Sequence, residues 1–67
     1  MDYTYKKIVN LLEQKQFYLG HIGRNQHIYI NKQIEKVILV PIYENEEIPE
    51  NVFMSIIKQA GIPKEEI

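Results

Sequence analysis

The stretch that decides the fold is Gly23-Arg24-Asn25-Gln26-His27-Ile28-Tyr29-Ile30. Its first three residues predict a tight turn, because Gly and Asn accept positive φ angles at little cost. The residues that follow are rich in β-branched and aromatic side chains, which predicts a strand over residues 26–31. A similar run over residues 17–22 precedes the turn, so the two runs predict an antiparallel hairpin.

A third strand is expected over residues 36–42, after a weaker turn at residues 31–33 that lacks Gly. Pro41 cannot donate a hydrogen bond to a neighbouring strand, so it marks the end of this strand or an edge. Gly20 lies inside the first strand, where Gly often marks a bulge. Short turns between consecutive strands predict an antiparallel meander of three strands.

A helix is predicted on each side of these strands. Thr4 can cap the first helix through its side-chain oxygen, and Ile8, Leu11 and Leu12 form one apolar face. This helix should end near Gln16, at a position where Gly usually adopts left-handed geometry. The second helix has Pro49 in its first turn and Gly61 as its C-terminal stop.

We therefore predict one α+β domain over residues 1–67, an α-β-β-β-α two-layer sandwich. Both helices should cover the same face of the antiparallel sheet, because each has a single apolar face to bury. The expected core consists of Leu11, Leu12, Val37, Leu39, Phe53, Ile56 and Ile57, unless the third strand has the opposite parity and buries Ile38 and Val40. In the second strand, Ile28 and Ile30 should face the helices, which leaves His27 and Tyr29 on the open face.

The composition limits the class of protein. The chain has no Cys, which excludes disulfides and thiolate metal sites and fits a reducing cytoplasm. It has no apolar run long enough to cross a membrane, and its first residues predict no signal peptide. The net charge is −1, but six of the eight Lys and Arg residues lie in positions 1–43, while six of the nine acidic residues lie in positions 44–67. The N-terminal part is therefore mildly basic, and the acidic loop at residues 44–47 should lie outside any surface that binds a nucleic acid.

Several short motifs follow one another along the chain. They are Leu11-Leu12-Glu13, Phe17, Val40-Pro41, Glu47-Ile48-Pro49 and Ile56-Ile57-Lys58-Gln59-Ala60-Gly61-Ile62. The chain thereby resembles the HicA (YcfA-like) family of small toxins from bacterial toxin–antitoxin pairs. The resemblance implies a fold similar to that of double-stranded-RNA-binding domains, an mRNA-cleaving activity, a HicB-type antitoxin as partner and no cofactor.

The resemblance also implies where the catalytic residue lies. The family has a catalytic His about nine residues after the Phe of its first strand, in a Gly-Ser-His or Gly-Ser-Asn-His turn. In this chain that position holds Gln26, and Tyr29 matches the aromatic residue that follows. A Gln amide can orient a hydroxyl group but cannot accept its proton, whereas the imidazole of His has a suitable pKa. The neighbouring His27 is the alternative catalytic residue.

Two further sets of residues are candidates. RNA binding is assigned to Lys6, Lys7, Arg24 and Lys32 through phosphate groups, to Tyr29 through stacking on a base, and to His21. A three-residue turn would place His21 opposite His27 on the open face. Two His without nearby carboxylates predict no metal site. Three hypotheses remain open: an RNA-cleaving toxin, a degenerate relative that binds without cutting, and a protein-interaction module.

Overall fold

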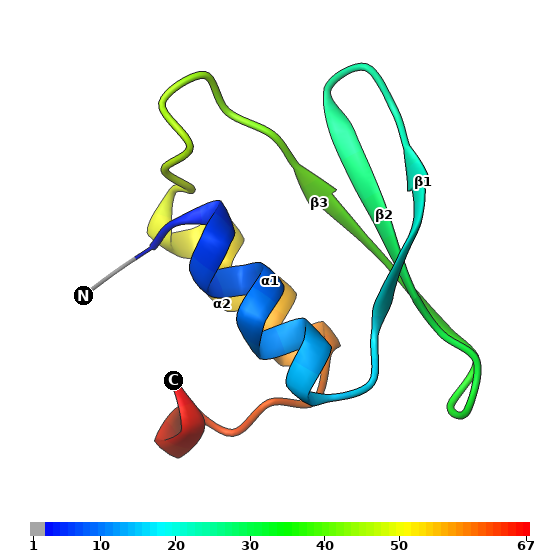
Figure 1. Ribbon diagram of the computed structural model, residues 1–67. Helices are drawn as coiled ribbons and strands as arrows, with labels where there is room; N and C mark the ends of the chain where they lie inside the picture. Colours follow the sequence, from blue (N-terminus) through cyan, green and yellow to red (C-terminus); the bar gives the residue numbers. More distant parts are fainter. Residues whose placement is uncertain (1–2) are drawn as a thin grey trace.

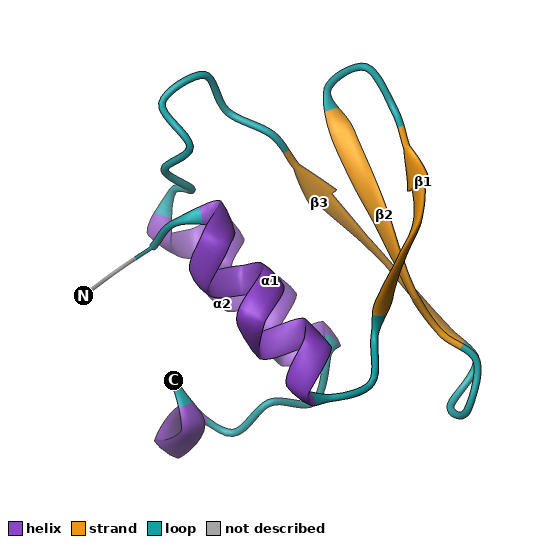
Figure 2. Cartoon of the chain, viewed as in Figure 1, coloured by secondary structure: helices purple, strands orange, loops and turns teal. Residues whose placement is uncertain are grey.

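The computed structural model describes residues 3–67 and confirms the predicted order of elements. The elements are α1 (Tyr5–Gln14), β1 (Tyr18–Ile22), β2 (Gln26–Asn31), β3 (Lys36–Pro41), α2 (Glu50–Gln59) and the short 3₁₀ helix η1 (Lys64–Glu66). The strands form one antiparallel sheet in the order β1-β2-β3. Figures 1 and 2 show the two helices together on one side of this sheet, as the two-layer prediction requires.

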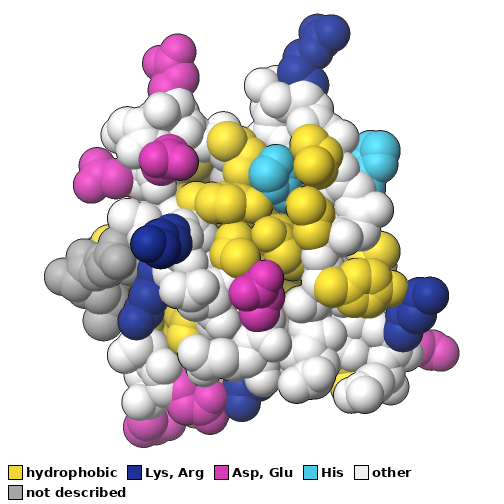
Figure 3. All heavy atoms as spheres, viewed as in Figure 1, with side chains coloured by type: hydrophobic (Ala, Val, Ile, Leu, Met, Phe, Trp, Pro, Cys, Tyr) yellow, Lys and Arg dark blue, Asp and Glu magenta, His cyan; other side chains and the backbone are white. Residues whose placement is uncertain are grey.

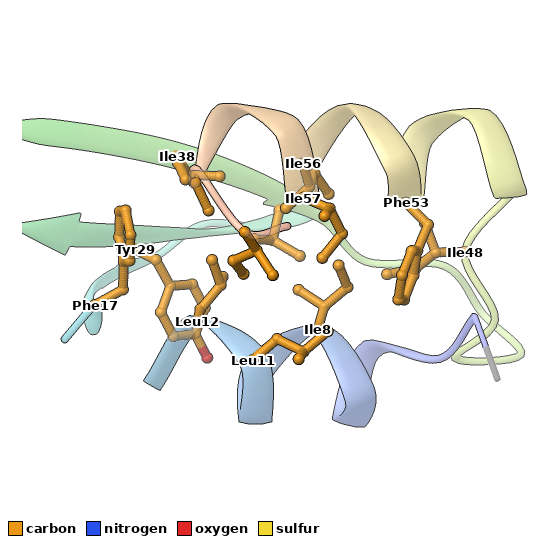
Figure 4. Packing of buried hydrophobic residues seen from close by; sticks show 13 residues of the cluster. Ile8, Leu11, Leu12, Phe17, Tyr29, Ile38, Ile48, Phe53, Ile56 and Ile57 are labelled. Carbon is orange, nitrogen blue, oxygen red and sulfur yellow. The ribbon is translucent and has the colours of Figure 1, made fainter. Parts of the chain in front are cut away.

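The hydrophobic core lies between the two helices and the sheet. Figure 4 shows the apolar side chains of α1 and α2 pointing toward one another, with the strands alongside. The buried apolar residues are Ile8, Leu11, Leu12, Phe17, Tyr29, Ile38, Val40, Ile48, Phe53, Ile56, Ile57, Ala60 and Ile62. The predicted helical contribution to the core is therefore confirmed. Among residues 3–67, no helix is long and apolar enough to cross a membrane.

Both ends of α1 follow from local sequence. The Thr4 side chain accepts a hydrogen bond from the Lys7 backbone N–H at 3.2 Å, which is the predicted N-cap. At the other end Gln16 has φ 71°, and Phe17 N–H donates to Leu12 C=O at 3.0 Å. These features form a Schellman motif, in which the residue with positive φ is normally Gly.

The bulge predicted at Gly20 is present. The pairing of β1 with β2 shifts by one residue between Leu19 and His21. A Cβ atom on Gly20 would lie 2.2 Å from Cδ1 of Ile30, so any larger residue would displace that side chain. Gly20 is therefore required by the close approach of β1 to the Ile30 side chain on the open face.

The parity that we expected for β2 and β3 is wrong. In β3, Ile38 and Val40 are 1% and 0% exposed, whereas Val37 and Leu39 are 64% and 49% exposed. Successive strand residues point to opposite faces, and β3 therefore presents Ile38 and Val40 to the helices. Val37 and Leu39 belong to the open face, and the alternative parity is the correct one.

Strand β2 is reversed in the same way. Its inward positions are His27, Tyr29 and Asn31, and Ile28 and Ile30 lie on the open face, paired with Leu39 and Val37. The reason is that the helix layer supplies a hydrogen-bond partner for each inward polar group. The Tyr5 hydroxyl forms hydrogen bonds with His27 and Tyr29, and Lys15 C=O accepts from the Asn31 amide at 2.8 Å.

The open face of the sheet carries no Asp, Glu, Lys or Arg side chain along its three strands. Each pair of register partners lies on one face, so this face can be read from the strand pairing. Its members are Tyr18, Gly20, His21, Gln26, Ile28, Ile30, Val37, Leu39 and Pro41. Several of them are large, apolar and exposed, among them Tyr18, Val37 and Leu39. A contiguous apolar surface of this kind is typical of an interaction site.

Candidate functional site

Gln26 and His27 open strand β2, and their side chains lie on opposite faces of the sheet. Gln26 pairs with Pro41 and shares the open face with Ile28. The Gly23 N–H donates to the Gln26 C=O at 2.7 Å and closes the turn between β1 and β2. His27 pairs with Ile22 in β1 and Val40 in β3, so it lies on the face that carries the helices.

The His27 ring is held by a tyrosine from α1. Its Nδ1 atom is hydrogen-bonded to the Tyr5 hydroxyl, and the two rings meet edge to face with their centroids 5.3 Å apart. The Tyr5 hydroxyl also lies 3.1 Å from the Tyr29 hydroxyl. These three side chains form a hydrogen-bonded set, here called the Tyr5–His27–Tyr29 trio. Tyr5 and His27 are half-buried, while Tyr29 is only 4% exposed.

The Tyr5 hydroxyl stays protonated under ordinary conditions. Its burial raises the pKa of Tyr5 well above the usual value for a phenol, and the hydrogen bond to Tyr29 acts in the same direction. Tyr5 is therefore a neutral group that can both donate and accept one hydrogen bond near neutral pH. It can fix the orientation of His27 without itself taking part in proton transfer.

An apolar rim borders the trio on the outer side. Leu19 and Ile22 pair with Tyr29 and His27, so they lie on the same face of the sheet, and both are exposed at the edge strand β1. Figure 3 shows a histidine side chain among hydrophobic side chains on the face of the molecule where α1 lies. His27 is half-buried in this setting, so its ring is partly shielded from water.

The expected pairing of the two histidines is wrong. The structure pairs His21 with Ile28 and His27 with Ile22, so the histidines lie on opposite faces. A three-residue turn would have paired Ile22 with Gln26, but Gly23 and Gln26 are themselves joined within the turn. The pair therefore cannot act as acid and base on one substrate. Among residues 3–67, no group of at least three His, Cys, Asp or Glu residues is placed to hold a metal ion.

The expectation that Tyr29 faces the open side is also wrong. Its ring belongs to the buried core and contributes its hydroxyl to the trio. A side chain so little exposed cannot offer a ring face to an RNA base. Its position in β2 is nevertheless important, because it brings a second hydroxyl within hydrogen-bond distance of Tyr5.

The four cations assigned to RNA binding do not share one surface. Arg24 lies in the turn before β2 and Lys32 in the turn after it, so the length of the strand separates them (Figure 1). Lys6 and Lys7 follow Tyr5 in the first turn of α1. The acidic loop reaches this end of the helix too, because Tyr5 N–H donates to Glu46 C=O at 3.0 Å. The acidic loop is therefore closer to two of these cations than we expected.

Sequence reasoning missed Tyr5, the residue that organises the site. It lies 22 positions before His27, and no spacing motif joins the two. The sequence of β2 did contain a signal. His27, Tyr29 and Asn31 alternate with apolar residues, so all three lie on one face of the strand. Buried polar groups require hydrogen-bond partners, so this alternation indicated that polar groups on a helix would meet the strand.

Comparison with models of known protein families gave a match. A family model described as the HicA toxin of bacterial toxin–antitoxin matches residues 5–62. The matched region includes α1, the whole sheet and α2, and it contains Tyr5, Gln26 and His27. No curated protein and no solved structure matches the chain.

Proposed function

From the premise that this chain belongs to the HicA toxin family of bacterial toxin–antitoxin systems, we propose that it is a cytoplasmic toxin that binds mRNA and cleaves it. A HicB-type antitoxin neutralises it by binding the protein. The reaction is an endonucleolytic cut that needs no cofactor. The observation that carries this proposal is the Tyr5–His27–Tyr29 trio, because it holds an imidazole in a fixed orientation beside an apolar rim.

The chemistry is attack of an RNA 2′-hydroxyl on the adjacent phosphate. The bond between the 2′-oxygen and phosphorus forms as the bond between phosphorus and the 5′-oxygen breaks. The 2′-hydroxyl proton passes to Nε2 of His27, and the leaving 5′-oxygen takes a proton from the imidazolium or from water. The products are a 2′,3′-cyclic phosphate end and a 5′-hydroxyl end. General acid–base catalysis of this kind contributes roughly 10²–10⁴ in rate.

Three of the four candidate cations lie close in the sequence to members of the trio. Lys6 and Lys7 directly follow Tyr5 in α1, and Arg24 precedes His27 by three positions. We assign these three residues to the RNA phosphates on either side of the cleaved bond. Lys32 lies at the far end of β2 and is given no part in this surface.

Gln26 occupies the position at which the family resemblance expects a catalytic His. Its side chain lies on the open face, away from Tyr5. An amide cannot take a proton from a hydroxyl group. We therefore assign the proton transfer to His27 and keep Gln26 as the alternative that any experiment must include.

A second candidate function is a protein-interaction module that does not cut RNA. The apolar open face favours it, because an exposed surface that includes Tyr18, Val37 and Leu39 suits a protein partner better than a polyanion. An antitoxin that covers the open face fits either function. Cleavage of RNA is therefore the property that distinguishes the two.

The test is induced expression of the natural chain and of a His27→Gln variant, followed by growth and by analysis of RNA ends. His27→Gln is the matched substitution, because its amide retains hydrogen bonding and loses proton transfer. We expect arrested growth and new 5′-hydroxyl ends for the natural chain only. Arrested growth with intact RNA would overturn the cleavage, and growth without arrest for both proteins would overturn the toxin assignment.

A further inference from the structure

Tyr5 takes no part in the bond changes proposed above, yet its hydroxyl is the only group in the described residues that contacts both His27 and Tyr29 through side-chain hydrogen bonds. We propose that Tyr5 is a positioning residue, which occupies Nδ1 of His27 and thereby presents Nε2 to the RNA. This inference rests on the proposed function, since it names the atom of His27 that exchanges the proton.

The hydrogen atoms of the trio can be arranged in two ways that keep both hydrogen bonds and use the Tyr5 proton within the trio. A phenol has one proton to donate. If Tyr5 donates to Nδ1 of His27, Tyr29 must donate to Tyr5. If Tyr5 donates to Tyr29, His27 must donate its Nδ1–H to Tyr5. In both arrangements Nδ1 is occupied by Tyr5, but only in the second is Nε2 unprotonated and able to take the proton of a substrate hydroxyl.

Protonation of His27 selects one of these arrangements. An imidazolium carries a hydrogen on both nitrogens, so its Nδ1 can only donate. Tyr5 must then accept from His27, which leaves its own O–H free to donate a hydrogen bond to Tyr29. Nε2 can take a proton only while Nδ1 carries the hydrogen of the neutral ring, so Tyr5 accepts from His27 both before and after proton transfer.

The elements around the trio explain why the ring cannot easily turn away. Tyr5 is the first residue of α1, and the preceding Thr4 caps that helix. Tyr5 N–H is also fixed by Glu46 C=O, and Ile48 N–H donates to Tyr3 C=O at 2.7 Å. The backbone of Tyr5 is therefore held from both sides, and the position of its hydroxyl follows from helix and loop together. Side chains that hold a reacting group are effective when their own positions are fixed.

The first experiment measures the imidazole nitrogens of His27 by NMR on the natural protein labelled with ¹⁵N-histidine. We expect the neutral ring to show one tautomer, with Nδ1 protonated and Nε2 unprotonated, because only this tautomer can take the proton of the RNA hydroxyl. In Tyr5→Phe we expect averaged nitrogen signals, because nothing then holds Nδ1. Averaged signals in the natural protein, or signals that Tyr5→Phe leaves unchanged, would overturn the inference.

The second experiment measures cleavage of a short single-stranded RNA. Tyr5→Phe should lower kcat by about 10²-fold, the cost of a misplaced reacting group, with KM unchanged because the phenol does not contact RNA. Tyr18→Phe is the matched control, since it removes a hydroxyl from the open face, and it should leave both constants unchanged. Equal kcat in Tyr5→Phe and the natural protein would overturn the inference.

The two experiments separate failure of the inference from failure of the proposed function. If the natural protein shows a single His27 tautomer that Tyr5→Phe abolishes, but cuts no RNA, the positioning stands and the cleavage does not. If it cuts RNA while its His27 tautomers average, the cleavage stands and the positioning does not.

Discussion

Gln16 and Gly61 adopt the same left-handed backbone conformation, each at the residue that follows a helix C-cap. Their φ angles are 71° and 72°. Phe17 N–H bonds to Leu12 C=O after α1, and Ile62 N–H bonds to Ile57 C=O in the same way after α2. The two helices therefore end in the same motif, but only α2 has the residue that takes this conformation without strain.

Gln16→Gly is expected to stabilise the fold. The substitution removes the strain of a side chain in left-handed geometry, which is about 1 kcal/mol. For a domain of this size, that corresponds to a rise in Tm of about 4–8 °C. Thermal unfolding followed by circular dichroism measures it, with Gly61→Ala as the reciprocal change, which should lower Tm. A Tm for Gln16→Gly at or below that of the natural protein would contradict the strain argument.

Neighbouring residues of β3 should respond very differently to truncation. Ile38 is buried against the helices and Leu39 lies on the open face. Ile38→Ala should cost about 2–5 kcal/mol, because it leaves a cavity in the core. Leu39→Ala should cost less than about 1 kcal/mol, because its side chain is already half in water. Urea denaturation of both variants measures the difference, and similar costs would show that the strand has no single buried face.

The order of elements could be predicted from the sequence because it depends on local signals. Thr4, Gly20 and Gly61 each act within a few residues, and the structure has the cap, the bulge and the helix end where they were expected. Strand parity could not be predicted in this way. In β2, apolar and polar residues alternate, and the rule that apolar residues face inward selected Ile28 and Ile30.

The site was only partly predictable for the same reason. His27 was recognised as a chemical candidate, but the face on which it lies depends on Tyr5 and Lys15, which come from another element. Polar groups can be buried when a partner satisfies them. A strand that carries His27, Tyr29 and Asn31 inward is therefore stable only together with α1. The sequence of the strand alone does not show which face is buried.

The raised pKa of Tyr5 predicts a specific loss of stability at high pH. In the unfolded chain, Tyr5 begins to lose its proton near pH 10, whereas in the folded protein it keeps the proton to a higher pH. The unfolded state then binds fewer protons, so the free energy of unfolding falls as pH rises above about 10. Below that pH this contribution is fully present.

Tyr5→Phe should show a smaller fall than the natural protein when urea midpoints are compared between about pH 9 and pH 11. Other groups also titrate in this range, so the comparison uses Tyr18→Phe, which removes an exposed hydroxyl from the open face and should show the natural fall. An identical fall in Tyr5→Phe and in the natural protein would mean that Tyr5 ionises equally well in the folded state.

RNA binding should be weak and should depend on salt. Three phosphate contacts on single-stranded RNA give a slope of log affinity against log salt of about −2. Arg24→Ala should make that slope shallower by about 0.7, whereas Lys32→Ala should leave it unchanged, because Lys32 lies at the other end of β2. Fluorescence anisotropy between about 50 and 200 mM salt measures the slopes. An equal effect of the two variants would argue against a binding surface around the trio.

Gln26 and His27 offer the most direct test, because adjacent residues of one strand are the two candidates for the proton acceptor. His27→Ala should lower the rate of RNA cleavage by roughly the 10²–10⁴ that a positioned acid–base group provides. Gln26→His should leave the rate unchanged, because its side chain lies on the open face and lacks the contact with Tyr5. Both positions are only half-buried, so neither variant should unfold the protein, and circular dichroism provides that control. If Gln26→His instead raises cleavage and His27→Ala has no effect, the family register identifies the reacting position and the trio serves only to join α1 to the sheet.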